Sequence, residues 1–216
     1  MKQTTRKSGT QTLFLSVLMS APGPLIIGAG LLVGRSATQI ADFVRRSAEL
    51  LGIIASYIVY RMTAGDPAFD TERRRQLERR SACFVGAMMC LGGAIMLLLA
   101  ILSENTDKGN VIPGLVIALL GVIANTLFWL KYRRLNRTEP NAILAVQARL
   151  YRAKSLVDFC VTAALLTVLA APASPAAYWV DRIGSAIVAL YLIRCGVMTF
   201  TEQRPAVSDA GKEPLP

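Results

Sequence analysis

The chain contains no histidine, and charged residues make up only 18% of its 216 positions. It also lacks a glycine-rich phosphate loop, a nucleophile elbow and the H-E-x-x-H zinc motif. Because these signatures of nucleotide-dependent, hydrolytic and zinc enzymes are missing, we expect no enzymatic activity and no cofactor. Hydrophobic residues supply 53% of the chain, which is typical of a membrane protein with several spans rather than of a soluble domain.

The four cysteines form no recognisable metal or redox pattern. Cys83, Cys90, Cys160 and Cys195 all lie within apolar stretches, and no two of them have C-x-x-C spacing. We interpret them as small buried side chains, with a soft-metal thiolate site as the less favoured alternative.

Six apolar stretches have close to the roughly 20 residues that a helix needs to cross a bilayer. They are Thr12 to Val33, Ser36 to Tyr60, Ala82 to Leu102, Ile112 to Trp129, Ala142 to Ala170 and Ala176 to Phe200. The sequence therefore predicts an all-α membrane protein with six transmembrane helices in residues 12–200. We expect a cytoplasmic tail at 1–11, a disordered cytoplasmic tail at 201–216 with no C-terminal cytosolic domain, and a kink in the first span at Pro22 and Pro24.

The basic residues favour one side of this predicted bundle. Those of the favoured side are Lys2, Arg6, Lys7, Arg61, Arg73, Arg74, Arg75, Arg79, Arg80, Lys131, Arg133, Arg134 and Arg137, whereas the opposite connections hold Arg35, Lys108 and Arg182. The positive-inside rule then places both termini in the cytoplasm. We interpret residues 73–80 as an orientation signal in preference to a lipid-headgroup or partner site, and the net charge of +10 does not indicate nucleic-acid binding.

Charged residues interrupt the second and fifth spans. Arg45 and Glu49 lie four residues apart in the second span, as do Lys154 and Asp158 in the fifth. Charges at mid-membrane depth are costly, so they indicate a functional site. The two spans run antiparallel, and Glu49 and Lys154 both lie about 20 Å from their entry surfaces at 1.5 Å per residue. We therefore expect a Glu49–Lys154 ion pair, with Arg45 facing Asp158 one turn nearer the outside.

Two segments carry a resemblance to a known family. Residues 34–61 (GRSATQIADFVRRSAELLGIIASYIVYR) and 142–161 (AILAVQARLYRAKSLVDFCV) resemble the second and fifth transmembrane helices of the cation diffusion facilitators, and Trp179-Val-Asp181 resembles the start of their sixth. The resemblance covers about residues 13–200. It implies a cation-efflux-like helix bundle that transports a cation in exchange for protons.

In that family, the second and fifth helices each supply two ligands, four residues apart, to a tetrahedral site for zinc or a similar ion. In the second span, the resemblance places these positions at Arg45 and Glu49. In the fifth span, which is aligned through Arg152 and Leu156, it places them at Leu150 and Lys154. Arginine has no lone pair to donate and a protonated lysine repels a metal ion, so only Glu49 remains a plausible ligand and no tight zinc site is expected.

Asp42 matches the acidic residue that opens the family's motif in the second helix, where it would be an accessory ligand or a cap for polar groups. The candidate transport-site residues are thus Asp42, Arg45, Glu49, Leu150, Lys154 and Asp158.

Two classes of function follow. In the first, the protein is a cation transporter whose degenerate metal site works through ion pairs or protons, and Glu49, Lys154 and Asp158 contact the proton or substrate. In the second, it is a transport-inactive structural or regulatory membrane subunit.

The expected partners are the lipid bilayer, a cation or proton, and a second copy of the chain. We expect it to be integral to a bacterial inner membrane. Gly86, Gly92 and Gly93 offer a small-residue face for a homodimer.

Overall fold

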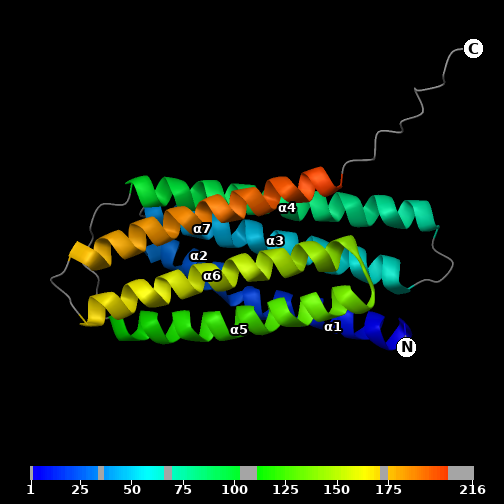
Figure 1. Ribbon diagram of the computed structural model, residues 1–216, viewed down its shortest axis with the longest axis horizontal. Helices are drawn as coiled ribbons and strands as arrows, with labels where there is room; N and C mark the ends of the chain where they lie inside the picture. Colours follow the sequence, from blue (N-terminus) through cyan, green and yellow to red (C-terminus); the bar gives the residue numbers. More distant parts are fainter. Residues whose placement is uncertain (1, 34–36, 66–69, 103–110, 171–174, 204–216) are drawn as a thin grey trace, which may run out of the picture.

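The computed structural model describes residues 2–33, 37–65, 70–102, 111–170 and 175–203, which are almost entirely helical and include no strand. The helices lie along one common axis (Figure 1) and confirm the predicted all-α class. They are α1 (Lys2–Ser20), α2 (Pro22–Val33), α3 (Ala37–Gly65), α4 (Thr71–Leu102), α5 (Val111–Thr138), α6 (Ala142–Ala170) and α7 (Pro175–Glu202).

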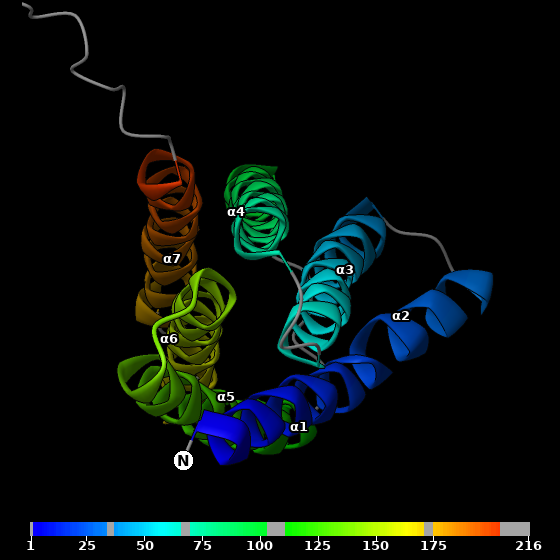
Figure 2. The same cartoon turned by 90° about the vertical axis from the view of Figure 1, so that its right-hand side faces the viewer.

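The first predicted span consists of two helices that meet at Ala21. Proline has no backbone N–H, so Pro22 and Pro24 remove two donors from the helical ladder. The ladder resumes where the Leu25 amide donates to the Ala21 carbonyl over 3.4 Å. The predicted kink is therefore confirmed, and Figure 2 shows α2 diverging from the rest of the bundle. Residues 2–11, which were expected as a tail, form the first turns of α1.

The basic residues of the favoured side lie on helical extensions rather than in loops. The helix α3 continues to Gly65, α4 begins at Thr71 and α5 continues to Thr138. The starts of α1, α4 and α6 and the ends of α3, α5 and α7 all lie at the same end of the molecule (Figure 1). We call this the basic end, after residues 61, 73–80 and 131–137.

Four segments of the described chain are long and apolar enough to cross a membrane. They are Lys7–Ala29, Thr71–Ile101, Leu115–Thr138 and Ile183–Glu202. The helices α3 and α6 are also 29 residues long each, and both carry charged residues in their interior. The second and fifth predicted spans thus carry charged residues in their interior. We call Arg45, Glu49, Lys154 and Asp158 the polar centre.

Small residues allow α4 and α7 to approach closely. A Cβ atom added at Gly93 would lie 2.8 Å from the Ala189 carbonyl oxygen, and one at Gly86 would lie 3.1 Å from the Gly196 carbonyl oxygen. The small-residue face that the sequence offered to a homodimer is therefore covered by α7 of the same chain. Gly92 is different, because its nearest neighbour is the Arg45 side chain at 3.6 Å.

Aromatic side chains fill the bundle between its middle and the basic end. The ring of Tyr151 lies 5.0 Å from that of Phe128 and 5.5 Å from that of Tyr132, measured between centroids. Both tyrosines are fully buried, as are Leu13 and Ile143 around them. Large apolar side chains are exposed along the whole length of the bundle, as expected for surfaces that face lipid. The buried aromatic rings lie between the middle of the bundle and the basic end.

Candidate functional site: a buried ion-pair cluster

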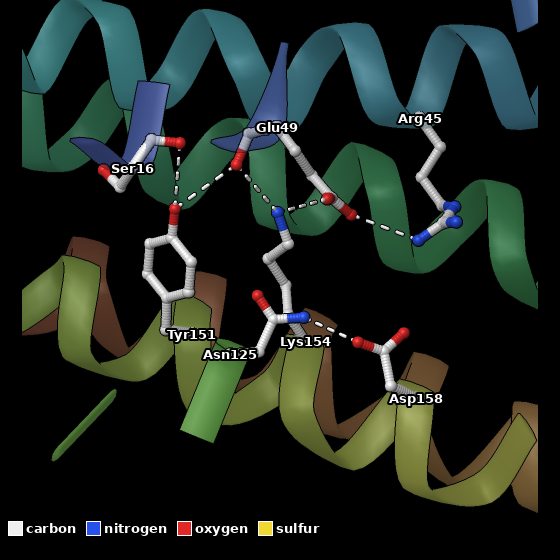
Figure 3. Close-up of polar contacts among 8 residues, drawn as sticks. Ser16, Arg45, Glu49, Asn125, Tyr151, Lys154 and Asp158 are labelled. Carbon is white, nitrogen blue, oxygen red and sulfur yellow. Dashed lines mark hydrogen bonds and ion pairs between the residues drawn. The ribbon is translucent and has the colours of Figure 1, made fainter. Parts of the chain in front are cut away.

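Glu49 is the centre of a buried group of charges between α3 and α6. Its side chain is 7% exposed, and each carboxylate oxygen has a cationic neighbour (Figure 3). The Lys154 Nζ atom lies 3.4 Å from Oε2, and the Arg45 Nη1 atom lies 3.2 Å from Oε1. The predicted contact between Glu49 and Lys154 is confirmed. Because Arg45 is on the same helix one turn earlier, the four-residue spacing is sufficient to bring it to Glu49.

Lys154 reaches from α6 to the end of α1. Its Nζ atom lies 3.5 Å from the Ser20 hydroxyl and 5.2 Å from the centroid of the Tyr151 ring. Ser20 is the last residue of α1, where the helix dipole concentrates partial negative charge. The ammonium is therefore surrounded by a carboxylate, a hydroxyl, a helix C-terminus and an aromatic face, all of which favour a positive charge.

Asp158 has a different partner from the one predicted. Its Oδ2 atom accepts a hydrogen bond of 2.6 Å from Asn125 Nδ2 on α5 (Figure 3), while among the described residues it forms no ion pair with Arg45. Gly121, one turn before Asn125, leaves room for this carboxylate, since a Cβ atom there would lie 2.5 Å from Oδ2. Asn125 was missed by sequence reasoning, although a lone amide in an apolar span is a usable signal.

Leu150 lies apart from the charged residues of α6. It is 1% exposed and belongs to the apolar core. The α6 residues at the polar centre are Lys154 and Asp158, one turn apart, and a role of Leu150 in transport stays a prediction. Asp42 lies in α3, but its side chain is outside the part of the chain that the structure describes.

Hydroxyl groups tie α1 to α5 and α6 on the basic-end side of Lys154. The Tyr151 hydroxyl lies 3.3 Å from Ser20 Oγ and donates to the Ser16 carbonyl oxygen over 3.4 Å. Ser16 Oγ in turn lies 2.8 Å from the Tyr132 hydroxyl. These contacts, with the aromatic rings that carry them, close the polar centre toward the basic end.

The comparison with protein families identifies the class. A model of the cation efflux transmembrane domain matches residues 13–205 of the chain. The chain belongs to the cation efflux family. It is therefore an integral membrane protein of a cation-transporting class, and the resemblance seen in its second and fifth spans is confirmed. No curated protein matches the chain.

The described residues of this cation efflux protein do not present a usual site for a soft divalent metal. Among the described residues, no group of three or more histidine, cysteine, aspartate or glutamate side chains comes together. The two carboxylates of the polar centre, Glu49 and Asp158, are instead accompanied by Arg45 and Lys154. Tetrahedral zinc sites use imidazole, thiolate and carboxylate ligands, whereas a charged arginine or lysine side chain has no lone pair to donate to a metal.

Proposed function

We propose that this protein transports a cation through the polar centre, where the Lys154 ammonium replaces a bound metal. In each cycle, one monovalent cation is exchanged for one proton carried by Lys154. The observation that carries the proposal is the 3.4 Å contact between Lys154 Nζ and Glu49 Oε2, which spans α3 and α6 inside the bundle. The lysine is a cation tethered to the transport site, so an incoming ion must compete with its charge.

Charge balance supports a monovalent substrate. The groups Arg45, Glu49, Lys154 and Asp158 bring two positive and two negative charges to the centre, and the exposed Arg46 acts on both carboxylates from farther away. Loss of the Lys154 proton leaves one negative charge uncompensated, which is costly at this depth. A single monovalent cation restores the balance, and therefore cation and proton exclude each other.

The available ligands support a hard cation. With Lys154 neutral, the oxygens nearest to its position belong to Glu49 and Ser20, and the Asp158 carboxylate lies one turn away on α6. Carboxylate and hydroxyl oxygens suit hard cations, whereas soft-metal selectivity needs sulfur or imidazole. We therefore favour an alkali cation over zinc as the substrate.

Proton flux in proteoliposomes tests this function. With a pH dye trapped in the lumen, an inward gradient of Na⁺ or K⁺ should make the lumen alkaline, and Zn²⁺ should not. Lys154→Met should abolish the response, whereas Arg75→Gln, a change at an exposed residue of the basic end, should preserve it. Zinc-driven flux, or an undiminished response in folded Lys154→Met protein, would contradict the proposal.

A transport-inactive subunit is the second candidate. It is favoured by the burial of Glu49 between two cations at once, because a closed ion-pair network stabilises one conformation. In that case the wild-type protein gives no proton flux with any cation, yet remains folded in the same vesicles.

We further propose that the basic end faces the cytoplasm of a bacterial inner membrane and that all six spans cross it. The bias of lysine and arginine toward one end supports this orientation. In a variant whose native cysteines are replaced by alanine, Arg75→Cys and Arg134→Cys should react with impermeant reagents only from the cytoplasmic side. Lys108→Cys, which lies outside the described residues, should react only from the other side. External labelling at position 134 would contradict the six-span topology.

A further inference from the structure

We propose that Arg152 and Arg194 form a binding site for the phosphate group of an anionic membrane lipid, on the outer surface of α6 and α7. This site is separate from the polar centre and does not depend on the proposed transport function. It rests on the geometry of Arg152, on the charge balance around it and on its depth in the membrane.

Arg152 is held in place by aromatic rings but has no anionic partner among the residues that the structure describes. Its guanidinium carbon lies 5.8 Å from the centroid of the Trp129 ring on α5 and 5.7 Å from that of the Tyr191 ring on α7. The residue is nevertheless exposed. Within the described ranges, the guanidinium makes no hydrogen bond or ion pair with the protein. Five N–H donors on a fixed, exposed plane match the oxygens of a phosphate group.

The neighbouring charges leave this surface positive. Arg149, three residues before Arg152, is paired with Glu202 through contacts of 2.5 and 2.6 Å. Arg194 is exposed and follows Tyr191 by three residues, so it shares the face of α7 that meets Arg152. In the described part of the chain, neither Arg152 nor Arg194 has a carboxylate within ion-pair distance. Two arginines on adjacent helices therefore remain available to one anion.

The depth of the site selects a lipid as the source of the phosphate. Trp129 comes just before the basic residues at the end of α5, and tryptophan is typical of the boundary between acyl chains and headgroups. Arg152 is exposed and lies two residues before Lys154, about 3 Å nearer the basic end along α6, and its long side chain carries the guanidinium to the Trp129 ring. At this position the available anions are lipid phosphates, and each arginine near such a surface strengthens the attraction.

Lipid selection by the purified full-length protein tests the site. Native mass spectrometry should show phosphatidylglycerol retained in preference to phosphatidylcholine from an equimolar mixture. The double variant Arg152→Gln/Arg194→Gln should lose this preference by roughly tenfold. Arg73→Gln/Arg75→Gln removes the same net charge from exposed residues of the basic end and should keep the preference.

Three results would overturn the proposal. The first is no preference in the wild-type protein, and the second is an equal loss in the Arg73/Arg75 control, which would indicate a general effect of charge. The third is displacement of the lipid by soluble glycerol phosphate, which would point to a free phosphate. If the double variant does not fold, Arg194→Gln alone decides the matter, because Arg194 has no polar contact with the described protein and its loss should still reduce the preference several-fold.

Discussion

Replacing Glu49 by glutamine is expected to lower the folded yield far more than replacing Glu49 and Lys154 together. The single change leaves Lys154 and Arg45 without the carboxylate that lies 3.4 and 3.2 Å from them. Breaking a buried ion pair from one side typically costs about 3–5 kcal/mol, whereas the double replacement also removes the Lys154 charge and leaves only Arg45 without its carboxylate. Lys154→Met should be less harmful than Glu49→Gln, because Glu49 keeps Arg45 as a partner.

A double-mutant cycle measures the interaction between Glu49 and Lys154. The quantity measured for each variant is the fraction of protein that remains monodisperse after heating. The control is the Arg74–Glu78 pair, which has the same four-residue spacing as Arg45 and Glu49 but lies at the basic end. Glu78→Gln should cost at most about 1 kcal/mol. Additive losses for Glu49 and Lys154 would show that the two residues are not energetic partners. A folded double variant that fails to transport would assign the pair to transport, and one that transports normally would make it structural.

Gly93→Ala is expected to destabilise the protein even though alanine is the better helix former. The added Cβ atom would lie 2.8 Å from the Ala189 carbonyl oxygen and 2.7 Å from Ile193 Cγ1. Separating α4 from α7 to relieve this overlap should cost roughly 1–3 kcal/mol.

Gly92→Ala is the matched control for Gly93→Ala. It changes the neighbouring residue of the same helix, and its Cβ atom would meet only the flexible Arg45 side chain at 3.6 Å. It should leave stability unchanged or raise it by up to about 1 kcal/mol, the difference in helix propensity. Thermal unfolding of the two variants in the same detergent provides the comparison. Equal midpoints would mean that α4 and α7 are not in close contact.

The sequence predicted the features that depend on composition and on local rules. Long apolar stretches locate the helices, prolines at positions 22 and 24 predict the break at Ala21, and charges in two antiparallel spans predict the contact of Glu49 with Lys154. Each of these follows from the free-energy cost of placing an unsatisfied backbone donor or an unpaired charge in the membrane.

The features that were missed depend on which faces of the helices meet. Asp158 was assigned to Arg45, but α5 packs on α6 and supplies Asn125, while Arg45 finds Glu49 on its own helix. Gly86 and Gly93 of α4 contact α7 of the same chain, because sequence spacing does not distinguish a neighbouring helix from a neighbouring molecule, and the homodimer stays a prediction. The predicted spans stopped short of the helical extensions at the basic end, since the arginines there lower hydropathy without disfavouring a helix.

The break at Ala21 gives α1 a freedom that the continuous helices lack. Bending a helix normally stretches the hydrogen bonds of a whole turn, but at this position Pro22 and Pro24 have already removed two of them. Ser16 and Ser20, the α1 side chains that contact Tyr132, Tyr151 and Lys154, all lie on one side of the break. A bend at Ala21 therefore costs fewer backbone hydrogen bonds than a bend elsewhere in the first span, and it would move Ser16 and Ser20 relative to the polar centre.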